Sequence, residues 1–406
     1  TRDADLYIDE EDAQDLVGEV ERQLKKRQRG QAVRLEFEVG TSRFMRRFMT
    51  QEMNLEKEDM YQIDGPLDMT VFFGFCGIKG YNHLRYPEAH PHSPWSILEL
   101  KRTPETNIFD MIREKDLLIH LPYESFDESV VNFLYSAAND KDVLAIKQTL
   151  YRVSSSSPVV QALEKAVQNG KQVTVLMEVK ARFDEANNIL MARRLEKAGA
   201  HVIYGLVGLK THSKCTLVIR REKDGIRRYV HVATGNYNAS TAKLYTDLGI
   251  LTCNDRFGID ASAFFNLLSG YSDPPIWDSF IVAPINLRQR CIELIDREIH
   301  FAKNGEDAHM IAKMNSLLDK GIIEKLYEAS QAGVKIELIV RGICVLIPGI
   351  PGVSDNITVR SIVGRFLEHS RIFWFRNGGR EELYISSADW MPRNLNDSVE
   401  LMVPIE

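Results

Sequence analysis

Two histidines, each followed two residues later by a cation, are the residues best suited to chemistry in this sequence. His212 stands in Thr211-His-Ser-Lys214, and His369 stands in Glu368-His-Ser-Arg371. A neutral imidazole can attack phosphorus while the neighbouring Lys or Arg neutralises phosphate oxygens, whereas the same cation would oppose the charge of a metal ion. The pattern therefore favours a phosphoryl centre over a metal site.

The two histidines belong to an internal duplication. A helix-like segment ending in glycine and followed by an apolar run occurs twice, as Ala162–Gly170 before VTVLMEV and as Lys325–Gly333 before VKIELIV. Two further matched pairs accompany it: Ala145–Leu150 with Ile311–Ser316, and Gly235–Asn238 with Ser386–Asp389. A single buried histidine is more often structural than functional. Two histidines at equivalent places in a repeat favour a shared function.

Alternating strand and helix patterns must position these residues. Strands are predicted at Val143–Leu150, Val173–Val179 and His201–Tyr204, a helix at Ala186–Ala198, and another helix with Ser157 as N-cap and Pro158 in its first turn. This order predicts a mainly parallel sheet covered by helices. Period-two alternation predicts that His212 and Lys214 share one face of a strand, as do His369 and Arg371.

Three domains are expected in 406 residues. We assign an α+β head to residues 1–103, a first α/β domain to 104–280 and a second α/β domain to 281–406. The head contains a helical pattern from Glu10 to Arg29 and an alternating strand pattern from Ala32 to Val39. Both ends of the sequence stop abruptly, so we expect it to be part of a longer protein.

Composition argues against several classes of protein. The net charge of −6, from 51 basic and 57 acidic residues, does not favour a nucleic-acid-binding protein, and at most peripheral association with a membrane is expected. The five cysteines lack CxxC spacing, which is typical of a reduced cytoplasmic protein without disulfides or structural zinc.

Positive charge is nevertheless concentrated near His212. Twelve Lys or Arg residues and six Asp or Glu residues lie between Glu178 and Arg228. Arg152, Arg182 and Arg341 follow predicted strands, where ligands collect in α/β sheets. No Walker-type glycine loop is present. We therefore expect arginines at strand ends to hold a polyanion.

Long motifs extend the analysis to a known family. The paired histidines on duplicated α/β units resemble the phospholipase D superfamily, and longer segments resemble bacterial polyphosphate kinase. These segments are VKARFDEANNI, YGLVGLKTHSK, TGNYNASTAKLYTDLGILT, RSIVGRFLEHSRIFWF and YISSADWMPRN. The resemblance covers essentially the whole chain and implies two tandem phospholipase D-like α/β domains after the head. Known members also carry an N-terminal helical domain and a C-terminal extension that this sequence lacks.

The resemblance implies roles for individual residues. His212 matches the phosphorylated nucleophile and His369 the second essential histidine. Tyr245 and Arg341 match nucleotide-binding positions. Arg152 and Arg182 match positions associated with the magnesium–phosphate site; because arginine cannot ligate a metal, we expect both to contact phosphates that also hold Mg²⁺.

The implied activity is reversible transfer of the γ-phosphoryl group of ATP to the end of polyphosphate through a phosphohistidine, with ADP as the other product. We expect His212 to carry the phosphate and His369 to bind phosphates or move a proton, with Lys214 and Arg371 on the phosphates. Cations near an imidazole are expected to lower its pKa. Homo-oligomerisation is implied by the resemblance alone.

Two alternatives remain open. One is a phospholipase D-type phosphodiesterase, although Ile219 and Arg376 occupy the two aspartate positions of the HxKxxxxD pattern. The other is a non-catalytic scaffold that binds polyanions. Asp247 is one hypothesis for the carboxylate that orients His212; the alternative is that Asp247 is a solvent-facing turn residue.

Overall fold

The computed structural model describes residues 1–3, 16–27, 30–94, 97–98, 107–270 and 276–405. Its contacts divide the chain into two units, Thr1–Ala89 and His90–Glu406. The boundary predicted at 103/104 stays a prediction, because residues 99–106 lie outside the described part. Part of the helix predicted from Glu10 also lies outside it.

The first unit is an α+β module. Its helices are α1 (Leu16–Arg27) and α2 (Arg43–Met53), and its strands β1 (Leu35–Glu38) and β2 (Met60–Ile63) pair in parallel. Three short 3₁₀ helices complete it, at Lys57–Asp59, Met69–Gly77 and Asn82–Leu84.

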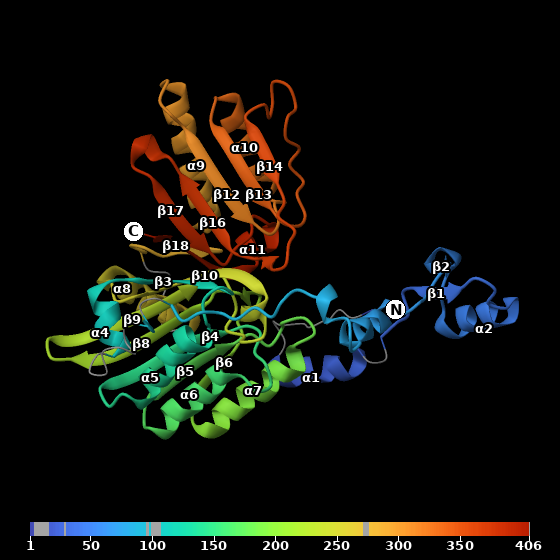
Figure 1. Cartoon of the computed structure of the whole chain (residues 1–406), viewed down its shortest axis with the longest axis horizontal. Coiled ribbons are helices and arrows are strands. Elements are labelled where there is room, and N and C mark those ends of the chain that lie inside the picture. Colours follow the sequence, from blue (N-terminus) through green and yellow to red (C-terminus); the bar gives the residue numbers. More distant parts are fainter. Residues whose placement is uncertain (4–15, 28–29, 95–96, 99–106, 271–275, 406) are drawn as a thin grey trace. The chain divides into compact units, whose positions relative to one another are not determined.

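The second unit contains two sheets, each with its own set of helices (Figure 1). The strands of the first sheet are β3 (Leu117–Leu121), β4 (Val143–Leu150), β5 (Gln172–Met177), β6 (His201–Tyr204), β8 (Cys215–Glu222), β9 (Gly225–Ala233) and β10 (Tyr245–Thr252). Its helices are α4 (Ile108–Glu114), α5 (Asn132–Asn139), α6 (Pro158–Gln168), α7 (Glu185–Ala198) and α8 (Asp255–Leu268), with a π-helical turn at Asp127–Val131 and a 3₁₀ turn at Thr241–Lys243.

The second sheet repeats this plan. Its strands are β11 (Ile281–Ala283), β12 (His309–Met314), β13 (Lys335–Val340), β14 (Ile357–Arg360), β16 (Arg371–Phe375), β17 (Glu382–Ser386) and β18 (Ser398–Ile405). Its helices are α9 (Leu287–Lys303), α10 (Lys320–Gln331) and α11 (Pro392–Asn396), with a 3₁₀ turn at Asn377–Gly379. Among the described residues, no helix combines the length and apolar character needed to cross a lipid bilayer.

The strand orders confirm the duplication. The first sheet runs β6-β5-β4-β8-β9-β10-β3 and the second runs β14-β13-β12-β16-β17-β18-β11. The prediction of mainly parallel sheets was wrong, because along these two strand orders only the β4–β5–β6 and β12–β13–β14 strands are parallel. The others are antiparallel, since short connections such as the turn between Glu222 and Gly225 join adjacent strands.

The registers also correct the alignment of the two copies. Leu150 pairs with Met177, seven residues after Gly170, and Met314 pairs with Val340, seven residues after Gly333. Leu150 therefore corresponds to Met314 and not to Ser316. A shift of two residues keeps every side chain on the same face of a strand, so the strand pattern alone did not expose this slip.

Local signals account for the elements around the predicted site. The hydroxyl of Ser157 accepts a hydrogen bond from the backbone N–H of Val160, and Pro158 occupies the first turn of α6, as predicted. The bounds of β4 and β6 match the predicted strands. Both features follow from local residue chemistry, which explains why sequence reasoning found them.

An apolar core joins the two sheets. It contains residues from α8 and from strands of both halves: Leu217, Val230, Ile250, Phe264, Phe280, Val282, Ile385, Val399, Leu401 and Val403. All of these side chains are buried. The two halves are therefore held face to face by hydrophobic contact, and the polar site must be built at the edge of this core.

The buried carboxylate of Asp260 fixes the chain where it passes from one half to the other. It accepts hydrogen bonds from the backbone N–H groups of Asp278, Ser279 and Phe280, at 3.0, 2.6 and 2.8 Å. We predict that Asp260→Ala lowers the free energy of unfolding by about 3 kcal/mol, because it leaves these donors unsatisfied. A lower thermal midpoint measured by calorimetry would show this. Asp278→Ala is the matched control, because its carboxylate is exposed; equal midpoints for the two variants would contradict the prediction.

Candidate active site

Both candidate histidines lie in breaks between strands, not on the regular strands that the alternation predicted. His212 follows the two-residue strand β7 (Lys210–Thr211), and His369 follows β15 (Leu367–Glu368). Each short strand pairs with the sheet of the opposite half, β7 with β18 and β15 with β10. The chain must leave one sheet and enter the other at each histidine, which interrupts the expected strand.

The backbone of each histidine loop is tied to the opposite sheet. The carbonyl of Val399 accepts from the N–H groups of His212 and Ser213, at 3.0 and 2.9 Å. The carbonyl of Thr246 accepts equivalently from His369 and Ser370, at 3.3 and 2.8 Å. The two loops are therefore held by equivalent contacts, and both histidines face the junction of the two halves.

Each imidazole is paired with a carboxylate from the opposite half. His212 Nδ1 lies 2.9 and 3.0 Å from the carboxylate oxygens of Glu400, which is fully buried on β18. His369 Nδ1 lies 2.9 Å from both carboxylate oxygens of Asp247 on β10. The hypothesis that Asp247 orients His212 was therefore wrong: Asp247 is buried and orients His369.

Sequence reasoning missed Glu400, although the repeat contained a signal for it. Asp247 in Tyr245–Thr252 and Glu400 in Ser398–Ile405 are each the third residue of the segment and its one charged residue. The hydroxyls of Thr234 and Ser387 donate to these carboxylates in the two halves. This equivalence matches Gly235 with Ala388, two residues away from the predicted match with Ser386.

Burial is the largest influence on both imidazoles. It lowers the pKa of His212 to about 4, with Lys214 lowering it further and Glu400 opposing the change. Burial and then Arg371 lower the pKa of His369, against Asp247. The sequence-based expectation that cations would lower these pKa values identified the smaller cause. Both rings are neutral near pH 7.

The carboxylates fix which nitrogen carries the proton. Burial raises the pKa of Glu400, but contact with His212 and Lys214 outweighs this and holds that pKa below its ordinary value. The same holds for Asp247, whose pKa is lowered by His369 and Thr234 against burial. Each ionised carboxylate accepts the Nδ1–H of its imidazole, so the lone pair is on Nε2.

The two Nε2 atoms have different surroundings. A guanidinium nitrogen of Arg371 lies 3.2 Å from Nε2 of His369, and the same guanidinium pairs with Asp389 at 3.1 Å. This pairing contributes to lowering the pKa of Asp389 to about 2 against its burial. Among the described residues, no donor contacts Nε2 of His212. The lone pair of His212 is thus the more available one.

A cation-rich pocket of about 390 Å³ lies over the two histidines. Its lining contains six cationic side chains and one carboxylate, Asp389. The cations are Arg152, Arg182, Lys210, Arg341, Arg371 and Arg393. Such a lining is suited to a ligand with several negative charges.

The structure brings most of the sequence-predicted site residues to this pocket. His212, His369, Tyr245, Arg152, Arg182, Arg341 and Arg371 all line it. Lys214 does not: it is buried beneath His212, and its ammonium donates to the backbone carbonyl of His212. Burial lowers the pKa of Lys214 to about 7. Sequence reasoning missed Arg393, which enters the pocket from the short helix α11.

The described residues do not fit a protein-held Mg²⁺. No cluster of three or more His, Cys, Asp or Glu side chains able to hold a metal occurs among them. The carboxylate of the pocket lining is bonded to Arg371, and Arg152 pairs with Asp184 at 3.1 Å. Arginine has no lone pair for a metal. We therefore derive no step through a metal ion held by these side chains.

Comparison with known proteins identifies the family. The family model for the polyphosphate kinase middle domain matches residues 1–75, and those for C-terminal domains 1 and 2 match residues 107–274 and 280–406. The chain belongs to the polyphosphate kinase family. The predicted fold class is confirmed as two tandem α/β domains after an α+β head.

Individual relatives agree with this assignment. A polyphosphate kinase of Halalkalibacterium halodurans is 55% identical over 408 residues, covering 100% of this chain and 57% of the relative. One of Lactiplantibacillus plantarum is 52% identical over 405 residues, covering 100% and 55%. The crystal structure of polyphosphate kinase from Porphyromonas gingivalis superposes with a TM-score of 0.83 at 36% identity, covering 92% of this chain and 56% of that one. The chain thus spans little more than half the length of these relatives.

The lowered pKa of His212 predicts a resistance to protonation. Folding moves this pKa from 6.5 to about 4, so the neutral imidazole stabilises the fold fully above pH ~6.5, and this stabilisation is lost as the pH falls towards 4. We predict that ¹⁵N-histidine NMR will show His212 neutral from neutral pH down to about pH 5. His212→Asn assigns the signal. Titration of that signal near pH 6.5 would contradict the prediction.

Proposed function

We propose that this chain catalyses reversible transfer of the γ-phosphoryl group of ATP to the end of a polyphosphate chain through a phosphohistidine on His212. The observation that carries the proposal is the neutral imidazole of His212, buried against Glu400 and facing a pocket lined by six cations. Membership of the polyphosphate kinase family supports the substrate pair, ATP and polyphosphate.

The proposed reaction has two displacement steps. The Nε2 lone pair of His212 attacks the γ-phosphorus, the bond from phosphorus to the bridging oxygen breaks, and ADP leaves with that electron pair. A terminal phosphate oxygen of polyphosphate then attacks the phosphohistidine, the N–P bond breaks, and His212 returns to its neutral form. The same steps in reverse make ATP from ADP and polyphosphate.

Protein groups supply positioning and charge neutralisation. The Glu400 carboxylate accepts the hydrogen bond of Nδ1–H, so it would stabilise the positive charge that develops on the attacking imidazole. Arg152, Arg182 and Arg341 line the pocket and would neutralise the phosphate oxygens. Tyr245, whose ring lies 5.0 Å from that of His369, would contact the nucleotide.

The surroundings of the two histidines support a division of labour. The Nε2 atom of His369 lies within hydrogen-bond distance of Arg371. The lone pair of this nitrogen accepts that hydrogen bond and is therefore less available to attack phosphorus. We therefore assign His369 to binding phosphate or moving a proton at the leaving oxygen. Glu368 does not contact that imidazole; its carboxylate pairs with Lys313 at 3.0 Å.

The alternatives lack a supporting observation. A phosphodiesterase of the phospholipase D type would use aspartates where this chain has Ile219 and Arg376. Ile219 lies on β8, where its backbone pairs with Arg228 of β9. Arg376 forms ion pairs with Asp307 and Glu381. A scaffold that only binds polyanions would need the cations but neither imidazole–carboxylate pair.

Incubation with γ-labelled ATP tests the assignment. We predict that the wild-type chain becomes labelled and that His212→Ala stays unlabelled at any protein concentration, because it lacks the attacking nitrogen. His369→Ala should label slowly at His212. A stable label on His369, or labelling of His212→Ala, would contradict the proposal.

The strand-end arginines provide a second test. We predict that Arg182→Ala or Arg341→Ala lowers kcat/KM for ATP at least tenfold, a loss of about 1.4 kcal/mol or more, because each removes a charged contact to phosphate. Arg193→Ala on the exposed face of α7 is the control, since this residue does not line the pocket. Equal kinetics for Arg182→Ala and Arg193→Ala would refute the placement.

A further inference from the structure

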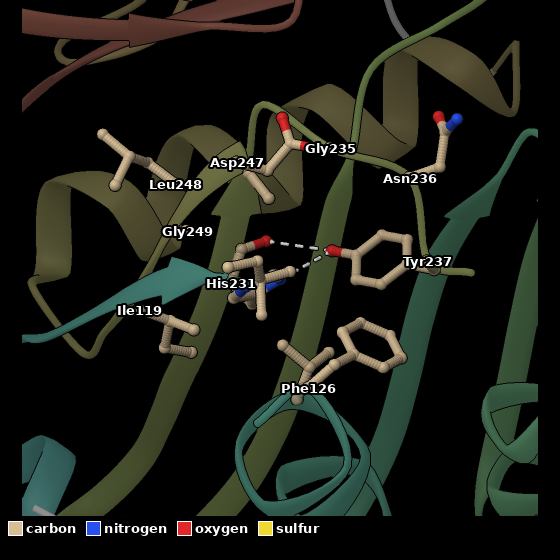
Figure 2. A pocket seen from close by; sticks show the side chains of 12 residues that line it. Ile119, Phe126, His231, Gly235, Asn236, Tyr237, Asp247, Leu248 and Gly249 are labelled. Carbon is tan, nitrogen blue, oxygen red and sulfur yellow. Dashed lines mark hydrogen bonds between the residues drawn. The ribbon is translucent and has the colours of Figure 1, made fainter. Parts of the chain in front are cut away.

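A buried polar layer lies behind Asp247 in the first half of the repeat. Thr216 Oγ1 lies 3.0 Å from Gln148 Oε1 and 2.9 Å from the hydroxyl of Tyr237, and that hydroxyl lies 2.9 Å from Nδ1 of His231. All four side chains are at most 3% exposed. Figure 2 shows Tyr237 pointing its hydroxyl at His231, close to Asp247.

The second half replaces three of these four side chains with apolar ones and His231 with Tyr384, whose hydroxyl donates to Glu382 instead. Phe373 stands four residues after His369, as Thr216 does after His212, and it pairs with Ala312 where Thr216 pairs with Gln148. Trp390 stands three residues after Ser387, as Tyr237 does after Thr234, and stacks on Phe373 at 4.9 Å. Among the described residues, the connected polar layer therefore occurs in the half that holds Asp247 and not in the other.

Two nitrogens of the layer lack a hydrogen-bond partner among the described residues, Nε2 of Gln148 and Nε2 of His231, and of these two residues only His231 lines the cavity described next. His231 is only 2% exposed, and its Nε2 has no hydrogen-bond partner among the described residues. Burial lowers the pKa of His231 to about 3, so the ring is neutral. Whichever nitrogen carries the proton, Nε2 needs one partner, either an acceptor or a donor.

His231 and Asp247 both line a small cavity of about 10 Å³ (Figure 2). Its other lining residues are Tyr237, Asn236, the two glycines Gly235 and Gly249, and the apolar residues Ile119, Leu121, Phe126, Val130, Ala233 and Leu248. The size of the cavity is close to the minimum for one water molecule.

The two glycines keep this space clear. A Cβ on Gly249 would lie 2.6 Å from Nε2 of His231, and a Cβ on Gly235 would lie 2.2 Å from a carboxylate oxygen of Asp247. Any larger residue at either position would overlap the side chain of His231 or Asp247, and that side chain would have to move. The two glycines therefore allow both polar side chains to stay at the cavity.

The two orienting carboxylates differ in their direct partners. Glu400 receives three side-chain donors, from His212, Ser387 and Asn394. Among the described residues, Asp247 receives side-chain hydrogen bonds from Thr234 and His369. Its side chain is also one methylene shorter than that of Glu400, and Asp247 lines the cavity.

We propose that this cavity binds a single structural water, which bridges His231 Nε2 and Asp247 and supplies the third donor that Glu400 obtains from Asn394. Water can donate to the carboxylate and can either donate to or accept from the imidazole. His231 is then a positioning residue: it acts through the water and Asp247 on the orientation of His369. The bridge itself does not depend on the proposed function, although its effect on phosphoryl transfer does.

A high-resolution crystal structure and NMR test the proposal together. We expect density for one water within hydrogen-bond distance of both His231 Nε2 and Asp247. In ¹⁵N-histidine-labelled protein, His231→Phe should shift or broaden the Nδ1–H signal of His369 and leave that of His212 unchanged. His231→Gln places an amide nitrogen near the former Nε2 and should restore the water and the His369 signal.

The matched control is Tyr229→Phe. Tyr229 is fully buried on the same strand and its hydroxyl donates to Glu222 at 2.6 Å, away from the cavity. It should change neither histidine signal. Absence of the water from the wild-type density, or an unchanged His369 signal in folded His231→Phe, would overturn the proposal. If His231→Phe does not fold, a His231→Gln protein that lacks the water but keeps the wild-type His369 signal would also overturn it. These readouts do not measure activity, so failure of this proposal can be distinguished from failure of the proposed reaction.

Discussion

The interface between the two α/β halves buries two carboxylates and two imidazoles, and this requirement fixes how the halves meet. An unpaired carboxylate in such a place would cost several kcal/mol. Each half meets the need of the other: Glu400 on β18 receives His212, and Asp247 on β10 receives His369. The apolar core between the sheets supplies the attraction, but it would tolerate sliding. The crossed pairs, together with the two-residue strands β7 and β15, permit one register.

Duplication brings two similar histidines to one pocket, and their neighbours then make them different. Lys214 is buried below His212 and bonds to its backbone, whereas the equivalent Arg371 reaches the ring nitrogen of His369 and pairs with Asp389. One imidazole keeps a free lone pair and the other shares it with a cation. Burial keeps both rings neutral, so the difference between them comes from hydrogen bonding more than from charge state.

Local residue chemistry made much of this structure predictable. The features that depend on contacts between distant segments could not be predicted from the sequence. The cap at Ser157, the strands β4 and β6, and the repeat itself follow from spacing and residue type, and the predicted pocket residues came from motifs. The strand breaks at the histidines could not be inferred, because β7 and β15 belong to the opposite sheet and have only two residues each. Glu400 was missed for the same reason: its partner lies 188 residues away in the other half. Arg393 reaches the pocket from α11, a five-residue helix with no charge pattern of its own.

The central claim is that each histidine takes its orientation from the carboxylate of the opposite half. Its most direct measurement is the pair of Nδ1–H proton signals of His212 and His369 in ¹⁵N-histidine-labelled protein at neutral pH. Glu400→Gln should remove or strongly shift the signal of His212 alone, and Asp247→Asn should do so for His369 alone. The reverse assignment, or two signals that ignore both substitutions, would contradict the crossed pairing.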